Sequence, residues 1–135
     1  MTDRHVTGSC LCGGVEYSVA EFIRPVVGCH CNQCRKTSGH FVAATKAQNR
    51  DLAMIRDDTL TWFRSSDAAE RGFCSRCGSN LFWRQVDGDT TSIMAGTLDA
   101  PTGLELAFHI FKGSAGDYYE FNDGLPAYDE GGERL

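Results

Sequence analysis

The sequence lacks long apolar runs, blocks of basic residues and an apolar stretch behind its first residues, Met-Thr-Asp-Arg-His. Without about 18 consecutive apolar residues, it contains no candidate transmembrane helix. The missing basic block and the net charge of −5 argue against nucleic acid and anionic membrane surfaces as main partners. The start of the chain predicts no secretory signal peptide. We therefore expect a cytoplasmic protein that binds neither nucleic acid nor membranes.

Internal repeats, linkers and long helical periodicity are also missing, which favours one β-rich domain. At 135 residues the chain has the length of a single domain, so residues 1–135 are taken as one. Its 15 glycines favour many tight turns between short strands. The fold class predicted from these features is all-β, with one or two helical turns.

Apolar and polar residues alternate along 15–19 and 104–111, as on half-buried strands, and other short apolar segments between polar breaks and turns also predict strands. Predicted strands cover residues 15–19, 25–28, 41–46, 52–55, 60–63, 80–86, 90–95 and 104–111. A short helical turn is expected over 35–40, with Gly39 as its cap. The polar stretch 65–71 is expected to be exposed.

Seven cysteines fall in three tight groups whose spacing is typical of metal ligands. The groups are Cys10-x-Cys12, Cys29-x-Cys31-x-x-Cys34 and Cys74-x-x-Cys77. Disulfides are the alternative, but an odd number leaves one thiol unpaired, and near neighbours rarely meet the required geometry. Both short spacings let one turn present two thiolates to an ion at about 2.3 Å. We therefore favour metal ligation, with zinc as the expected ion.

The division of the cysteines into sites is left open by their spacing. Structural zinc is normally closed by four protein ligands, whereas catalytic zinc keeps three and leaves one position for water or substrate. One division gives Cys10, Cys12, Cys74 and Cys77 to a structural site and the central three to an open site. Another joins Cys31 and Cys34 to Cys74 and Cys77. The central group is also compatible with a second structural site closed by His30, His40 or His109.

The motifs around the cysteines resemble those of the glutathione-dependent formaldehyde-activating family, also called the GFA or CENP-V/GFA domain. The resemblance covers about residues 8–128. It rests on the ordered motifs Cys-x-Cys, Cys-His-Cys-x-x-Cys-Arg-Lys, Phe-Cys-x-x-Cys-Gly-Ser, Gly-Thr-Leu-Asp and His-Ile. Family members often carry Pro-Trp after the His-Ile strand, whereas this chain has Asp117-Tyr118. We therefore predict no residues for the aromatic side of the pocket.

The resemblance implies a fold, a metal content and an activity. The fold would be the family's β-tent, in which several coiled antiparallel sheets surround zinc. Two zinc ions per chain are implied, a structural one on Cys10, Cys12, Cys74 and Cys77 and a second one on Cys29, Cys31 and Cys34. The activity would be that of a carbon–sulfur lyase that forms or cleaves S-(hydroxymethyl)glutathione. Its partners would be glutathione or another small thiol, and formaldehyde or another small aldehyde.

Addition of a thiol to an aldehyde requires a thiolate, a polarised carbonyl and near-attack placement. We expect the catalytic group to be Cys29, Cys31 and Cys34, with their zinc capturing the substrate thiol, because three thiolates blunt the Lewis acidity of the ion. Arg35 and Lys36 are the predicted partners of the glutathione carboxylates. Lys46 and Arg56 are further candidate cations. The candidate donors to the oxyanion are His30, Asn32, Gln33, Thr37 and His40.

Two other functions are compatible with the same residues. The protein would be a zinc-stapled binding module, or a thiol carrier, since glutathione and formaldehyde also combine without an enzyme. A thiol redox role would need a reactive cysteine outside the zinc sites, and none is left if both sites are filled. His109 is expected to be a hydrogen-bonded structural histidine. The ring of His30 is expected to point away from the metal, because both of its neighbours are ligands.

Overall fold

The computed structural model describes residues 5–131, and most of its regular structure is β-strand. The strands are β1 (Val6–Ser9), β2 (Val15–Val19), β3 (Arg24–Cys29), β4 (Val42–Gln48), β5 (Leu52–Asp57), β6 (Leu60–Arg64), β7 (Ala69–Cys74), β8 (Asn80–Gln85), β9 (Thr90–Met94) and β10 (Leu106–Ile110). One α-helix, α1 (Asn32–Ser38), and three 3-10 turns, η1 (Asn49–Asp51), η2 (Ala95–Thr97) and η3 (Lys112–Ser114), complete the described part. The all-β prediction is confirmed.

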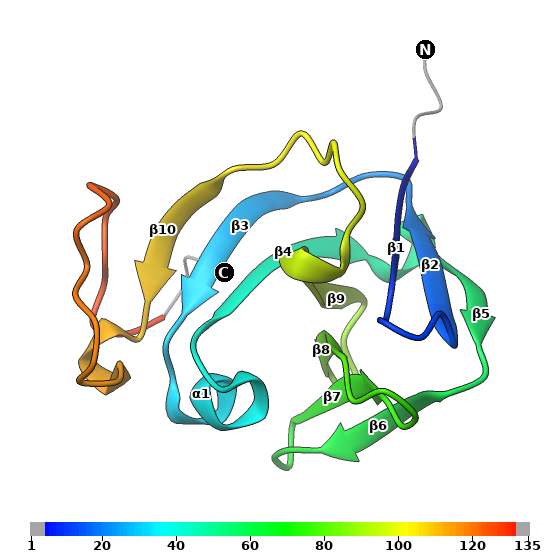
Figure 1. The fold of residues 1–135 in the computed structure, drawn as a ribbon, viewed down its shortest axis with the longest axis horizontal. Coiled ribbons are helices and arrows are strands. Elements are labelled where there is room, and N and C mark those ends of the chain that lie inside the picture. The colour runs from blue at the N-terminus through cyan, green and yellow to red at the C-terminus, as the bar shows by residue number, and fades with distance from the viewer. Residues whose placement is uncertain (1–4, 132–135) are drawn as a thin grey trace.

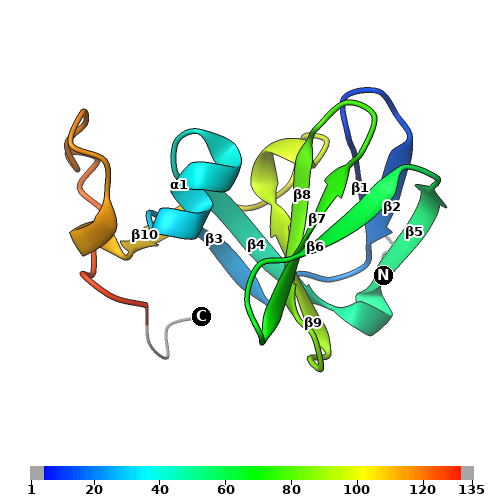
Figure 2. The ribbon, with the colours of Figure 1, turned by 90° about the horizontal axis from the view of Figure 1, so that it is seen from below.

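The strands form two sheets. The small sheet has the order β1-β2-β5, and the large one has the order β10-β3-β4-β9-β8-β7-β6. Neighbouring strands are antiparallel except β10, which runs parallel to β3 at one edge of the large sheet. Figures 1 and 2 show the large sheet curling, with the small sheet at one end of the molecule and the segment after β10 at the other.

The helix α1 follows directly from its sequence. Cys31 is its N-cap, and its sulfur accepts a hydrogen bond from the Cys34 amide. Gly39 ends the helix in the left-handed conformation at φ 86°, which costs glycine no steric strain, and its amide donates to the Arg35 carbonyl. The predicted cap is confirmed, and the helix begins earlier than expected, at Asn32.

The two sheets pack on a shared apolar core. Val15, Tyr17 and Val19 of β2 are fully or almost fully buried and pack with Phe82 and Ile93 of the large sheet. The rings of Tyr17 and Phe82 meet edge to face, with centroids 5.1 Å apart. Because side chains alternate along a strand, this packing leaves the opposite face of the large sheet free to form a site.

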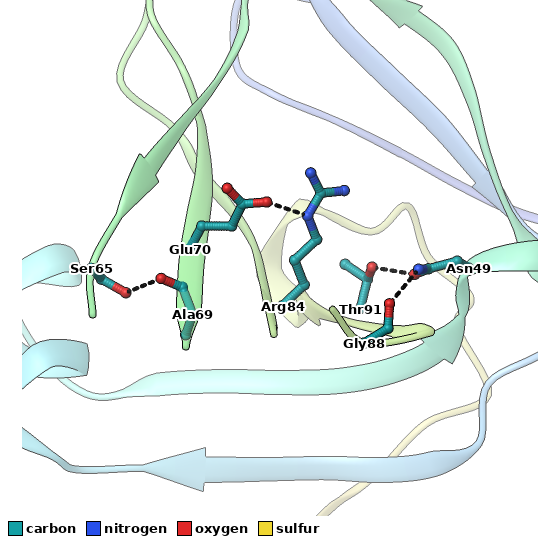
Figure 3. Close-up of polar contacts among 7 residues, drawn as sticks. All are labelled: Asn49, Ser65, Ala69, Glu70, Arg84, Gly88 and Thr91. Carbon is teal, nitrogen blue, oxygen red and sulfur yellow. Dashed lines mark hydrogen bonds and ion pairs between the residues drawn. The ribbon is translucent and has the colours of Figure 1, made fainter. Parts of the chain in front are cut away.

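Side-chain hydrogen bonds fix several turns and strand ends of the large sheet (Figure 3). Arg84 of β8 pairs with Glu70 of β7 at 2.7 Å. The amide side chain of Asn49 accepts from the Thr91 hydroxyl at 2.6 Å and donates to the Gly88 carbonyl at 3.4 Å. These contacts tie η1 and the β8–β9 turn to the sheet.

One segment differs from the prediction. Residues 65–71 were expected to be exposed, but β7 begins at Ala69, and the side chains of Ala69 and Arg71 are buried. A buried arginine has no distinct signature in the sequence pattern. The polar residues before Cys74 therefore predict an exposed loop, although β7 begins there.

Between residues 5 and 131, no helix is long and apolar enough to cross a membrane.

Candidate functional site

The first cysteine cluster joins the two sheets. Cys10 and Cys12 lie in the turn between β1 and β2, while Cys74 ends β7 and Cys77 lies in the turn before β8. The four sulfurs lie within 4.8 Å of one another, and Cys12 Sγ is 3.7 Å from Cys10 Sγ and 3.6 Å from Cys74 Sγ. Tetrahedral zinc with sulfur ligands at about 2.3 Å places those sulfurs roughly 3.8 Å apart. The four cysteines therefore fit a closed zinc site, and all seven cysteines of the chain are free of disulfides.

Hydrogen bonds to the sulfurs favour their thiolate forms in this cluster. The Val15 amide donates to Cys10 Sγ at 3.2 Å, and the Cys77 amide donates to Cys74 Sγ at 3.3 Å. Hydrogen bonds from Ser79 lower the pKa of Cys77 to about 5. Such donors orient metal ligands and stabilise their negative charge. Burial raises the pKa of Cys10, so at that position the hydrogen bond from Val15 acts against the effect of burial.

The second cluster brings Cys29, Cys31 and Cys34 together at the junction of β3 and α1. Their sulfurs also lie within 4.8 Å of one another, and within residues 5–131 no histidine or carboxylate joins the group. Hydrogen bonds from the Cys29 and Cys34 thiols lower the pKa of Cys31, while donation to Cys31 raises the pKa of Cys29. Three converging sulfurs without a fourth described ligand fit a zinc site with one open position.

His30 turns away from the second cluster into a buried hydrogen-bonded chain. The carboxylate of Asp123 can only accept, so His109 donates through Nε2 at 2.7 Å and accepts at Nδ1 from His30 Nε2 at 2.9 Å. His30 Nδ1 then accepts from the Tyr119 hydroxyl. Burial and the neighbouring His109 lower the pKa of His30 to about 4, which keeps its imidazole neutral. The hydrogen bonds that run from Tyr119 through His30 to His109 require this neutral form. The expected orientation of His30 is confirmed, and His109 is hydrogen-bonded as expected.

A cavity of about 300 Å³ lies beside the second cluster. Its lining comes from six strands of the large sheet, β10, β3, β4, β9, β8 and β7. Gln33 and Cys34 of α1 also contribute to its wall. Most of the lining is apolar, including Val42, Ala44 and Trp83. The cavity therefore offers the cysteine cluster a concave and largely apolar reaction space.

Three cations line the same cavity: Arg24, Lys46 and Arg71. Burial lowers the pKa of Arg24, and burial together with the charge of Arg24 lowers the pKa of Lys46. Lys46 was among the candidate cations, whereas the sequence reasoning missed Arg24 and Arg71. No local sequence pattern marks either arginine as a cavity residue, because an arginine in a polar stretch normally indicates an exposed position.

The other predicted site residues lie apart from the cavity wall. Arg35 donates to the Ser114 carbonyl at 3.3 Å, Lys36 is exposed on α1, and neither lines the cavity. Arg56 donates to the Gly13 carbonyl near the first cluster. Of the candidate oxyanion donors, Gln33 alone is among the cavity-lining residues. The hydroxyl of Thr37 donates to carbonyls within α1, and His40 pairs with Tyr118 at 2.6 Å.

Comparison with known proteins identifies relatives in sequence and in structure. The family model described as "Glutathione-dependent formaldehyde-activating enzyme" (GFA) matches residues 5–114. A protein of Schizosaccharomyces pombe, named "Uncharacterized lyase C29B12.13", is 29% identical over 82 residues, which are 60% of this chain. The match spans only 58% of that relative's length. A crystal structure of a Rhodobacter sphaeroides protein shares the fold, with a TM-score of 0.62 at 21% identity, over 90% of this chain and 98% of the other.

Proposed function

Because the chain belongs to the glutathione-dependent formaldehyde-activating enzyme family, we propose that it is a lyase that makes and breaks the carbon–sulfur bond between a small thiol and a small aldehyde. The observation that supports this best is the cluster of Cys29, Cys31 and Cys34, which lines a cavity and has no fourth ligand among the described residues. The family name points to glutathione and formaldehyde as substrates. The Schizosaccharomyces pombe relative is named a lyase, which is the same broad class of enzyme.

The reaction needs no oxidant or reductant. In one direction the thiol sulfur bonds to the carbonyl carbon and the thiol proton ends on the carbonyl oxygen. In the other direction the carbon–sulfur bond breaks and the proton returns to sulfur. Cys29, Cys31 and Cys34 would hold the zinc ion, which would supply an open position and favour the thiolate form of a substrate thiol. The apolar walls, which include Val42 and Met94, exclude water from the reacting atoms.

We propose zinc at both cysteine clusters, giving two ions per chain. The ion on Cys10, Cys12, Cys74 and Cys77 has a structural role, because these ligands close its coordination. Arg35 and Lys36 are proposed to bind the carboxylates of a thiol as long as glutathione. Both residues follow Cys34 on α1, outside the cavity, where the distal end of such a thiol would emerge.

Replacement of one cysteine in the second cluster tests the proposal. We expect Cys31→Ser to lose one zinc per chain and to slow the exchange between formaldehyde and S-(hydroxymethyl)glutathione to the uncatalysed rate. Its melting temperature should stay within a few degrees of the wild type. Exchange NMR with ¹³C-formaldehyde measures the rate against the spontaneous background, and circular dichroism measures the melting.

Two results would contradict the lyase. Unfolding of Cys31→Ser would make the second cluster structural. Binding of glutathione by the wild type without any acceleration of exchange would make the protein a thiol carrier.

A further inference from the structure

The cavity carries three positive charges and no acidic side chain in its lining. Arg24 and Lys46 face each other directly across β3 and β4, and Arg71 comes from β7. Like charges placed opposite each other on paired strands destabilise a sheet. An anion that enters between these cations would relieve their repulsion.

Arg71 is buried and only partly hydrogen-bonded. Its side chain is 5% exposed, and Nη2 contacts Gln33 Oε1 at 3.3 Å and Cys34 Sγ at 3.8 Å. Its Nε and Nη1 atoms are buried without a hydrogen-bond partner among residues 5–131, and so are Nε and Nη1 of Arg24. Buried charged donors without partners are costly, which marks these four atoms as places for a ligand.

Another partly buried arginine of the same sheet shows how the chain satisfies such a group when no ligand is involved. Arg84 pairs with Glu70 at 2.7 Å (Figure 3). Its guanidinium also lies 3.7 Å from the centroid of the Trp62 ring. Glu70 precedes Arg71 on β7 and therefore points to the opposite face. The pairing acid is on one face, and the unpaired guanidiniums are on the face that lines the cavity.

The cysteine cluster does not balance these charges. Three thiolates around a divalent ion carry one net negative charge, whereas Arg24, Lys46 and Arg71 are three cations. With a divalent ion on the three thiolates, an excess of two positive charges remains in the cavity lining. An anionic ligand is needed to neutralise it.

We propose that the substrate held in this cavity is a compact carboxylic acid whose carboxylate binds Arg71 and Arg24 beside the reacting sulfur or carbonyl. This inference rests on the proposed lyase function and narrows its substrate class. A guanidinium presents paired donors that match the two oxygens of a carboxylate. Formaldehyde carries no charge for these donors.

The distance between Arg71 and the cluster sets the size of the acid. Arg71 Nη2 lies 3.8 Å from Cys34 Sγ, so a carboxylate on Arg71 is only a few bonds from an atom bound at the cluster. Two kinds of substrate would supply such a carboxylate: a short acid that carries a thiol, or a short acid that carries an aldehyde.

Calorimetric titration of the zinc-loaded protein in chloride-free buffer tests the proposal without requiring turnover. One arm compares 3-mercaptopropionate with neutral 3-mercaptopropionamide, and the other compares glyoxylate with acetaldehyde. We expect the carboxylate to bind more tightly than its neutral partner in at least one arm. The arm that responds identifies whether the acid is the thiol or the aldehyde.

Two variants and one control assign the binding to the arginines. Arg71→Gln and Arg24→Gln should each weaken carboxylate binding by about tenfold to 100-fold and leave binding of the neutral compounds unchanged. Arg50→Gln, which removes an exposed arginine of η1 outside the cavity lining, should bind like the wild type. Zinc analysis and melting curves confirm that each variant is folded and loaded.

Three results would overturn the proposal. One is equal affinity for acid and neutral compound in both arms, and another is carboxylate binding that survives both substitutions. The third is loss of zinc in Arg71→Gln with unchanged carboxylate affinity after reloading, which would make Arg71 a counterion of the cysteines. A protein that binds the acids through Arg71 but fails to accelerate exchange would contradict the lyase while leaving the acid site standing.

Discussion

At the residue scale, buried polar groups divide into those that the chain satisfies and those that it leaves for a ligand. Tyr17 belongs to the first kind, because it is fully buried and its hydroxyl lies 2.6 Å from Thr97 Oγ1. The Thr97 hydroxyl donates to the Met94 carbonyl at 2.8 Å, so Tyr17 is the donor to Thr97. Arg71 belongs to the second kind. The contrast separates a group that stabilises the fold from one that serves a site.

The buried phenol of Tyr17 predicts a stability change at alkaline pH. Burial raises its pKa to about 12, whereas an unfolded tyrosine ionises near pH 10. Between these values the unfolded chain binds fewer protons than the folded one, so stability falls as pH rises. Tyr17→Phe lacks this loss and costs about 1 kcal/mol at pH 8 through its missing hydrogen bond.

Urea unfolding of both proteins at pH 8 and pH 11 measures the effect. The advantage of the wild type at pH 8 should vanish by pH 11. A difference that stays constant between the two pH values would show that Tyr17 titrates normally in the folded protein.

At the scale of elements, the parallel pair of β3 and β10 connects the second cysteine cluster to the buried histidines. Gly28 of β3 is the register partner of His109 of β10. A Cβ at Gly28 would lie 2.7 Å from His109 Nδ1 and 3.2 Å from the Phe41 ring. Glycine is therefore required here for the close approach of the His109 ring, which in turn holds His30 between two cysteines.

Gly28→Ala should destabilise the protein by about 1–3 kcal/mol, because it overpacks a buried contact. It should also weaken the hydrogen bond between His30 and His109. Urea unfolding measures the first effect, and ¹⁵N NMR of the imidazole nitrogens measures the second.

Gly96→Ala is the matched control, since a Cβ at Gly96 meets no atom within 4 Å. It should change stability by less than about 0.5 kcal/mol. Equal effects of the two substitutions would contradict a specific role for Gly28.

At the scale of the whole molecule, the two cysteine clusters connect different parts of the fold. The first joins the β1–β2 turn of the small sheet to the β7–β8 turn of the large one. The second lies at one junction, between β3 and α1, within a short stretch of chain. If both clusters bind zinc as proposed, loss of the ion from the first cluster would release a contact between the sheets, and loss of the ion from the second would change only local structure.

Metal analysis of reconstituted protein should give two zinc ions per chain. Cys77→Ser should lose one ion and lower the melting temperature by roughly 10 °C or more, because binding of a structural ion contributes directly to folding. Cys31→Ser should lose the other ion with little change in melting. One ion per chain in the wild type, or equal melting of the two variants, would contradict this division of roles.

Much of the fold and of the metal chemistry is determined by the sequence alone. The short spacings within Cys10-x-Cys12 and Cys74-x-x-Cys77 act within one turn, so their ligand character is visible without a structure. Alternation along 15–19 and 104–111 likewise predicts strands from local pattern, and β2 and β10 lie there. Gly39 predicts the end of α1 because its left-handed conformation is a local requirement.

Only the tertiary structure decided which groups meet across the chain. Spacing left the pairing of Cys10 and Cys12 open, and the packing of the two sheets brings them to Cys74 and Cys77. Arg71 looked exposed in a polar stretch, but the order of strands in the large sheet places it at a cavity with Arg24 and Cys34. Sheet order and the curl of the sheet depend on contacts between residues distant in sequence, and local spacing and periodicity carry no record of them.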